Sequence, residues 1–219
     1  EGGHGPSASQ RVRLVVGQAN GLKTGPRRQR VAVLGQEEVT ARFLVLATGA
    51  GDTLRRDLAI ARRVLRPRHS LAFGFNLRLS EAHRFPRAGA NLAGVTCYGD
   101  GITDGVDYLT LFPVAGALRA NLFAYRDYDA SWVKALRERP DDTLAAAFPH
   151  LSDTIGAFAV EGRIDSWSTD IAVADNVRQD GLVLIGDVFQ TSCPAAGLGV
   201  SRLLTDVERL CRHVPGWLR

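Results

Sequence analysis

The chain has 219 residues, of which 45% are hydrophobic and 23% are charged, as in an ordinary globular protein with an apolar core. No apolar run approaches the ~20 residues of a membrane-spanning helix. The formal charge of +4 comes from scattered arginine pairs without a basic stripe, which argues against nucleic-acid binding. The three cysteines are far apart, which argues against a disulfide framework or a metal site and favours a reducing, cytoplasmic location.

The first third of the chain predicts strands and one helix. Residues 1–10 are rich in glycine and serine and are expected to be a mobile lead-in. Apolar runs then predict strands at residues 11–16, 30–34 and 40–47, the first two joined by a turn-rich stretch with Gly21, Gly25 and Pro26. A glycine turn at residues 48–51 leads into a predicted helix over residues 52–65, with Asp52 as N-cap and Pro67 as terminator. This order is typical of a nucleotide-binding fold.

The middle of the chain predicts an antiparallel sheet followed by short helices. Alternating apolar residues, separated by Gly, Asp and Pro, predict strands at residues 71–79, 91–98, 108–112 and 118–125. Helical spacing then predicts helices at residues 130–138, 142–148 and 151–158. A strand near residues 162–167, a strand at residues 182–185 and a last helix at residues 199–213 complete the expected order.

The most informative segment runs from residue 181 to residue 210. A buried strand delivers Gly186 and Asp187 to its carboxyl end, where ligands of α/β sheets usually bind. A loop through Pro194 then leads to Gly197-Leu198-Gly199 at a helix start, which presents unpaired N–H groups and partial positive charge. A glycine permits close approach of a ligand, and an aspartate accepts hydrogen bonds from hydroxyl groups. A flavin has the matching polyol chain and a carbonyl that gains negative charge on reduction.

This segment resembles the second FAD motif of the p-hydroxybenzoate hydroxylase-like flavoproteins. The family pattern is Gly-Asp-Ala-Ala-His, a proline, Gly-Gln-Gly, an Asn two residues on and an Asp five further. The present sequence matches it at Gly186, Asp187, Pro194, Gly197, Gly199 and Asp206. It departs at residues 188–190, at Leu198 in place of the Gln and at Ser201 in place of the Asn. The resemblance implies that Asp187 meets the ribityl hydroxyls, that N–H groups near Leu198 to Val200 meet the pyrimidine edge, and that Pro194 lies beside the ring.

A second stretch, residues 46–55, resembles the family's Gly-Ala-Asp-Gly-Ala-x-Ser-x-x-Arg turn. Thr48 replaces the Asp and Asp52 replaces the Ser, while Gly49 is kept. Thr48 and Gly49 therefore join the expected cofactor-binding residues, although the Thr leaves nicotinamide binding open. Read as a dinucleotide fingerprint, the turn fails because Leu54 stands where a third glycine belongs.

Other chemically capable residues have simpler structural explanations. Cys193 is a candidate redox partner of a flavin, but a small loop residue is the simpler role. His69 is a candidate pocket residue, but no nucleophile or metal ligand accompanies it. The strand residues Arg78, Arg119 and Tyr125 face either a pocket or water, and the sequence leaves this open. No catalytic residue is assigned.

The resemblance implies an α/β fold that forms the later part of a two-domain FAD-binding protein. Residues 1–69 and 160–219 are expected to belong to the FAD-binding domain, and residues 70–159 to an antiparallel substrate domain. The family's first strand and Gly-x-Gly-x-x-Gly turn have no counterpart in this sequence. We therefore expect an N-terminal FAD-binding segment, on a separate chain or elsewhere in the same polypeptide, to pack against residues 11–16 and 182–185.

The function implied is that of an FAD-dependent monooxygenase. NAD(P)H would reduce FAD, and oxygen would pass from a flavin hydroperoxide to a small, often aromatic, substrate. Alternatives are a flavin-dependent reductase or dehydrogenase, a halogenase on the same scaffold, or a non-catalytic partner chain. The halogenases' Trp-x-Trp-x-Ile-Pro signature is absent from the sequence.

Overall fold

The computed structural model describes residues 13–26, 28–35, 38–51, 53–80, 87–88, 91–92, 94–99, 105–114 and 117–218. The chain forms two compact units. Unit 1 combines the described residues up to Arg62 with Ala174–Phe189 and the described residues from Leu203 onward. Unit 2 combines Arg63–Val173 with Gln190–Arg202.

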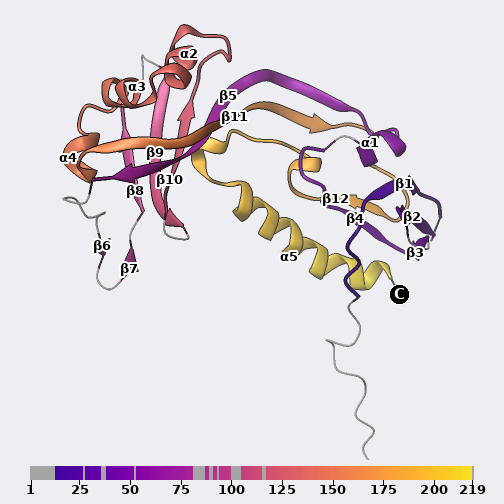
Figure 1. Ribbon diagram of the computed structural model, residues 1–219. Coiled ribbons are helices and arrows are strands. Elements are labelled where there is room, and N and C mark those ends of the chain that lie inside the picture. Colours follow the sequence, from indigo (N-terminus) through magenta and orange to yellow (C-terminus); the bar gives the residue numbers. More distant parts are fainter. Residues whose placement is uncertain are drawn as a thin grey trace, which may run out of the picture. The chain divides into compact units, whose positions relative to one another are not determined.

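Unit 1 contains an antiparallel sheet and a parallel strand pair (Figure 1). The sheet is formed by β1 (Ala19–Lys23), β2 (Gln29–Val33) and β3 (Val39–Ala41). The parallel pair is formed by β4 (Leu44–Leu46) and β12 (Leu182–Leu184). Leu22, Leu46, Leu58, Leu182 and Leu184 are among the buried residues that hold these elements together.

Two predicted strands of this unit are corrected. Residues 13–16, the described part of the predicted strand 11–16, are not in a strand, and β1 lies instead in the stretch expected to be a turn. Pairing with β2 places Gly21 opposite Ala32 and overrides the turn preference of the glycine. The predicted strand 40–47 is divided into β3 and β4, because the chain changes its pairing partner at Leu44. The Leu44 amide donates to the Gly181 carbonyl oxygen at 2.8 Å, and β4 then pairs with β12.

The helix predicted for residues 52–65 is much shorter. Helix α1 spans Thr53–Asp57, and Asp52, the predicted N-cap, lies outside the described residues. The chain leaves the helix at Ala59, whose φ of 52° is left-handed, and the amide of Ile60 donates to the Arg55 carbonyl oxygen at 3.0 Å. Burial of Ile60 in the core then directs the chain into a long strand that contains Pro67, the predicted helix terminator.

Unit 2 is built around a sheet with the strand order β11-β5-β10-β9-β8. Its strands are β5 (Arg62–Leu79), β8 (Val95–Tyr98), β9 (Val106–Val114), β10 (Ala117–Ala124) and β11 (Phe158–Ala174). Strand β10 pairs antiparallel with both β5 and β9, and β8 pairs antiparallel with β9. The antiparallel sheet predicted between residues 70 and 125 is thus confirmed. Within the predicted strand 91–98, β7 (Asn91–Leu92) pairs with β6 (Arg87–Ala88) rather than joining this sheet.

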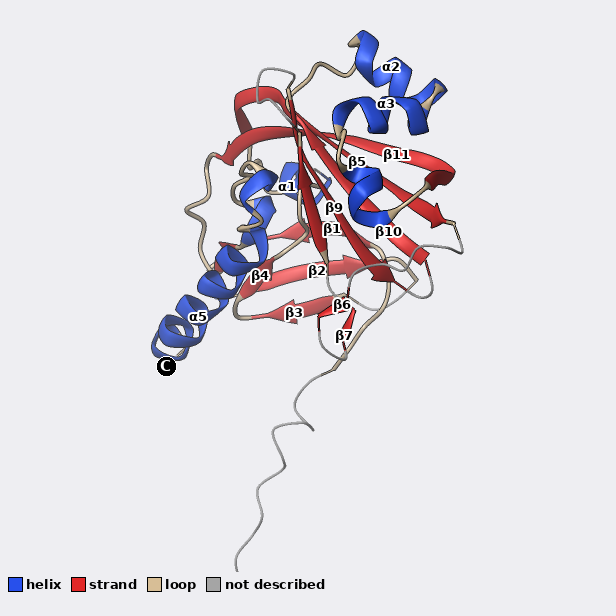
Figure 2. Ribbon diagram, turned by 90° about the vertical axis from the view of Figure 1, so that its left-hand side faces the viewer, coloured by secondary structure: helices blue, strands red, loops and turns tan. Residues whose placement is uncertain are grey.

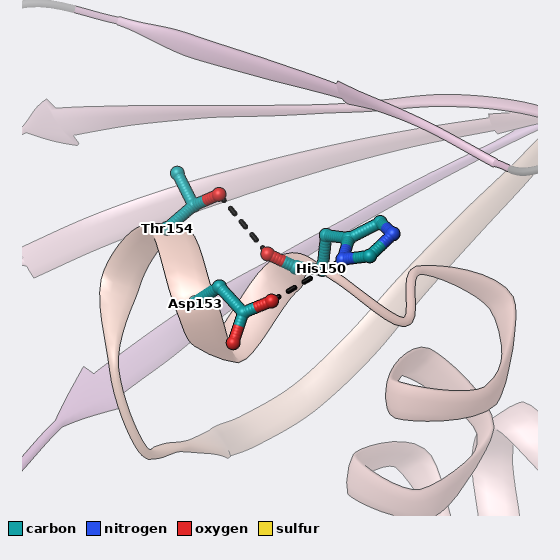
Figure 3. Close-up of polar contacts among 3 residues, drawn as sticks. All are labelled: His150, Asp153 and Thr154. Carbon is teal, nitrogen blue, oxygen red and sulfur yellow. Dashed lines mark hydrogen bonds and ion pairs between the residues drawn. The ribbon is translucent and has the colours of Figure 1, made fainter.

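Three short helices cover one face of this sheet (Figure 2). They are α2 (Ser131–Glu138), α3 (Pro140–Ala147) and α4 (Leu151–Ile155). The predicted helix 151–158 ends early because Gly156 takes a φ of 80°, and β11 then extends well beyond the predicted strand 162–167. At the start of α4, the Thr154 hydroxyl donates to the His150 carbonyl oxygen at 3.0 Å, and Asp153 contacts the exposed His150 ring (Figure 3).

Strand alternation gives the unit 2 sheet a core face and a second face, which we call the non-core face. Leu71, Phe73, Phe75 and Leu77 of β5 point into the core against the helices. Ala72, Gly74 and Asn76 alternate with them and therefore belong to the non-core face. By the register of the strands, the same face carries Arg119, Asn121 and Phe123 of β10 with Phe112, Thr110 and Tyr108 of β9.

The last helix, α5, spans Gly199–Trp217 and extends further than predicted. Apolar residues repeat along it at helical spacing, yet none of its residues is buried. Over the described residues, no helix combines the length and the apolar character that a membrane crossing requires.

Candidate functional site

In unit 1, the parallel strand pair brings two glycine-containing loops to one edge. The register aligns Leu44 with Leu182 and Leu46 with Leu184, and the amide of Ile185 extends the ladder to the Leu46 carbonyl oxygen at 3.1 Å. Because the strands are parallel, the loop after β4 and the loop after β12 leave from the same carboxyl end. Thr48 and Gly49 lie in the first loop, and Gly186 and Asp187 lie in the second. The structure therefore unites these four predicted site residues.

The Gly186-Asp187 turn is fixed from behind by α5. Gly186 has a φ of 66°, and its amide donates to Oδ2 of Asp206 at 3.1 Å. Asp206 thus fixes the turn, a role that its match to the family motif did not indicate. Asp187 lies within a single 3-10 turn, Gly186–Val188; it is exposed and has no hydrogen-bond or ionic partner among the described residues. Its carboxylate is free to accept hydrogen bonds from a polyol.

The first loop is also open to a ligand. Gly49 has a φ of 65°, a conformation that favours glycine, and no atom lies within 4 Å of the position of an added Cβ. Thr48 beside it is exposed. A ligand can therefore approach the backbone of this loop without displacing a side chain.

The second half of the predicted site lies in unit 2. Residues Pro194–Ala196 form a 3-10 turn, and Gly197 follows with a φ of 64°. Added Cβ atoms at Gly197 and Gly199 would meet no atom within 4 Å, and Leu198 and Val200 are exposed. Since the first N–H groups of a helix lack intrahelical acceptors, this start of α5 suits a negatively polarised carbonyl. The predicted convergence of both halves on one cleft stays a prediction.

Two tyrosine side chains of unit 2 contact the loop around Pro194 through their hydroxyl groups. The Tyr108 hydroxyl donates to the Ala195 carbonyl oxygen at 3.1 Å, and the Tyr125 hydroxyl lies 3.2 Å from the Cys193 sulfur. Phe123 stacks on Tyr108 at 5.6 Å between ring centroids and meets Tyr125 edge-on at 5.1 Å. The hydrogen bond to Cys193, and secondly burial, raise the pKa of Tyr125, and either group can be the donor in this contact. The sequence left the direction of Tyr125 open and favoured a small loop residue at Cys193 over a redox partner of a flavin.

The other candidate side chains do not form a catalytic group with these. The His69 ring lies edge-on against Tyr125 at 5.4 Å, and its Nε2 is buried with no partner among the described residues. In the described part of the chain, no three or more His, Cys, Asp or Glu side chains are arranged to bind a metal ion.

A separate polar groove of about 490 Å³ lies elsewhere in unit 2, around Tyr128. Arg137 stands 4.5 Å above the Tyr128 ring centroid and donates to the Ser166 hydroxyl at 2.9 Å. The Ser166 hydrogen bond, and then Arg137, lower the pKa of Tyr128. Burial, and then the charge of Asp107, raise the pKa of Tyr108.

We expect Tyr128 to ionise before Tyr108 and Tyr125 in an absorbance titration of the folded protein. Tyr128→Phe should remove the early step, and Ser166→Ala should move it upward in pH. In the folded state, the lowered pKa of Tyr128 favours stability as its phenol ionises. The raised pKa values of Tyr108 and Tyr125 have the opposite effect on the free energy of unfolding. Their contribution to stability is present below the ordinary tyrosine pKa of about 10 and is lost as the pH rises above it. An early step that survives in Tyr128→Phe contradicts the assignment.

No family model and no curated protein matches this sequence. Solved structures do share its fold. The flavin-dependent brominase Bmp2 matches 90% of this chain with a TM-score of 0.65 at 16% identity. The flavin-dependent halogenase CmlS matches 90% with a TM-score of 0.63 at 19% identity. The p-nitrophenol 4-monooxygenase PnpA from Pseudomonas putida DLL-E4 matches 89% with a TM-score of 0.61 at 16% identity.

The chain spans half or less of these structures, since the matches cover 49%, 36% and 47% of their respective lengths. The similarity shows a fold shared with parts of flavin-dependent halogenases and monooxygenases. At these identities it shows the fold alone.

Proposed function

We propose that the protein is an FAD-dependent oxidoreductase. The observation that carries the proposal is the parallel pair β4 and β12, which brings Thr48-Gly49 and Gly186-Asp187 to one edge of unit 1. The proposal is supported by the open backbone at Gly49, by the exposed carboxylate of Asp187, which has no partner over the described ranges, and by the similarity in fold to flavin-dependent enzymes.

The proposed cofactor contacts divide between backbone and side chain. Asp187 accepts hydrogen bonds from the ribityl hydroxyls of FAD, while Thr48 and Gly49 border the same cofactor. The N–H groups near Leu198, Gly199 and Val200 favour negative charge on the pyrimidine edge, and Pro194 and Gly197 shape the loop beside the ring. FAD, when bound, supplies the redox chemistry, and the protein's residues bind and orient it.

The first reaction that we propose is monooxygenation. NAD(P)H, a proton and O2 are consumed with the substrate, one oxygen atom enters a small organic molecule, and the other leaves as water. Strand β9 and the end of β10 contribute to the substrate side, because Tyr108 of β9 and Tyr125, which directly follows β10, contact the loop that carries Pro194. The proposed division into an FAD-binding domain of residues 1–69 and 160–219 and a substrate domain of residues 70–159 follows from this assignment.

A second candidate is halogenation on the same scaffold, and a brominase and a halogenase among the structures of similar fold favour it. A flavin-dependent reductase or dehydrogenase is the third, and a flavoprotein/dehydrogenase from Cytophaga hutchinsonii with a TM-score of 0.61 supports it.

We also propose that an N-terminal FAD-binding segment of the complete protein, on this polypeptide or a separate chain, completes unit 1. An apolar groove of about 390 Å³ lies between β12 and α5, lined by Phe43, Leu182, Leu184, Leu210 and Trp217 among others. Apolar surface of this kind is usually covered in a folded protein. The same segment would bind the ADP half of FAD.

The three reactions are distinguished by product mass. The full-length protein, supplied with FAD, is incubated with NAD(P)H, O2 and a panel of phenols and pyrroles, with and without bromide. A product heavier by one oxygen atom supports monooxygenation, and a bromide-dependent brominated product supports halogenation. NAD(P)H oxidation with neither product supports the reductase. A protein that binds no FAD and oxidises no NAD(P)H contradicts all three.

A further inference from the structure

Arg119 is a half-buried cation, and no acidic side chain pairs with it in the part of the chain that the structure describes. It lies on β10, on the non-core face of the unit 2 sheet. Among the described residues its one hydrogen-bond partner is the neutral side chain of Asn76 on β5, with 3.4 Å from Nη1 to Oδ1. A guanidinium has five N–H donors, and removing a charge from water is unfavourable unless it is paired. Most of the donors of Arg119 are therefore left for a ligand.

Gly74 provides the space in which the Arg119 guanidinium lies. A Cβ added at Gly74 would stand 2.2 Å from Nη2 and 3.2 Å from Cζ of Arg119, and 3.3 Å from Cη2 of Trp167. Gly74 is buried, and its φ lies outside the range that favours glycine, so conformational freedom does not explain the residue. The absence of a side chain explains why the residue is a glycine, because any larger residue would displace the Arg119 guanidinium.

The surroundings of Arg119 are suited to an organic group. Trp167, on β11, borders the same space and is 47% exposed, so an aromatic surface lies beside the cation. The strand register places Phe112 opposite Arg119 on β9. The combination of one guanidinium, one amide and two aromatic rings provides charge recognition together with apolar contact.

The same face leads from Arg119 toward the loop around Pro194. Phe123 lies four residues further along β10 and pairs with Tyr108, whose hydroxyl binds Ala195. At about 3.3 Å per residue, the two positions are ~13 Å apart along the strand. A ligand held at Arg119 by one end can therefore extend along the sheet toward this aromatic pair.

We propose that Gly74, Asn76, Arg119 and Trp167 form a binding site for the oxyanion group of an elongated, partly aromatic ligand. The group is a carboxylate or a phosphate, either of which the Arg119 guanidinium binds through two parallel N–H donors. In identifying this ligand with the substrate, the inference rests on the proposed function, because only then does the other end of the ligand lie beside a flavin.

Calorimetric titration with biphenylcarboxylate tests the site, with biphenylcarboxamide as the neutral probe of nearly equal shape and biphenyl phosphate as the second anion. We expect the wild-type protein to bind at least one anion about tenfold or more tightly than the amide, as a charge-assisted contact implies. The tighter of the two anions identifies the oxyanion. Equal binding of the amide and both anions contradicts the site.

Three substitutions locate the effect. Arg119→Met should abolish the preference for the anion, and Arg119→Lys should keep part of it, since a point charge remains without the planar fork. Arg139→Met removes the same charge at an exposed position between α2 and α3, on the other side of the sheet, and should leave the preference unchanged. An anion preference that persists in Arg119→Met contradicts the proposal, provided that its melting temperature matches the wild type.

FAD content is measured in the same samples, so the two proposals can fail separately. Protein that binds FAD but shows no anion preference contradicts this site alone. Protein that prefers the anion but binds no FAD contradicts the proposed function alone. The anion-binding site on the sheet would then stand without the flavin.

Discussion

Gly181→Ala is expected to destabilise the protein by about 2–4 kcal/mol, the sum of a left-handed backbone and an overpacked interior. Gly181 has a φ of 67°, and an added Cβ would lie 2.2 Å from Nε2 of Gln29 and 3.0 Å from the carbonyl oxygen of Arg42. Gln29 is fully buried and cannot easily move, because its Nε2 donates to the Gly25 carbonyl oxygen at 2.8 Å and its Oε1 accepts from the Gly25 amide at 3.3 Å. Urea unfolding of the full-length protein measures the loss.

Gly35→Ala is the matched control for this substitution. Gly35 lies in the same unit with a φ of 74°, yet no atom lies within 4 Å of its added Cβ. This variant should lose only the stability that a left-handed backbone costs a non-glycine residue, about 1–2 kcal/mol. If both variants lose the same free energy of unfolding, the Gln29 amide does not obstruct a side chain at residue 181, and the packing around Gly181 is less tight than the distances to Gln29 and Arg42 indicate.

Asp187→Ala is expected to weaken FAD binding about tenfold to a hundredfold, which corresponds to one charge-assisted hydrogen bond of roughly 1.5–3 kcal/mol. The reason is the position of Asp187 at the carboxyl end of β12, where its exposed carboxylate has no partner among the described residues. Asp187→Asn should retain part of the affinity, because an amide oxygen still accepts hydrogen bonds. Fluorescence titration of the flavin-free protein with FAD measures both.

Asp180→Ala controls for the loss of one negative charge. Asp180 is also exposed and also lies in unit 1, but it precedes β12 and is thus at the amino end of the strand. FAD affinity should not change in this variant. If Asp180→Ala and Asp187→Ala weaken FAD binding equally, the effect is one of overall charge, and the ribityl role of Asp187 is wrong.

Local patterns predicted most of unit 2 and the local structure of the motifs. Alternation of apolar residues indicated the strands that became β5, β9 and β10, because one face of each packs against α2 to α4. The strand β12, the turn at Gly186 and the helix start at Gly199 also follow the sequence signals. Such signals succeed where the hydrophobic face and the turn residues agree.

The errors arose where distant contacts decide the local structure. Helical spacing from residue 54 to residue 65 was real, but Ile60 is buried in the unit 1 core and the chain continues as β5. Gly21 favoured a turn in the sequence, but in the structure it pairs with β2 and belongs to a strand. The contact between Gly74 and Arg119 depends on the register of two strands, and the role of Asp206 depends on a contact 20 residues away. No single-sequence pattern specifies these.

The most direct test of flavin binding is a titration of the full-length protein, stripped of ligand, with FAD. We expect saturation at one FAD per protein, a yellow complex after gel filtration, and a shift of the flavin absorbance bands that Asp187→Ala diminishes. FAD that elutes entirely as free cofactor from the folded full-length protein, with unshifted absorbance bands, would contradict the assignment of the β4 and β12 loops as a flavin site.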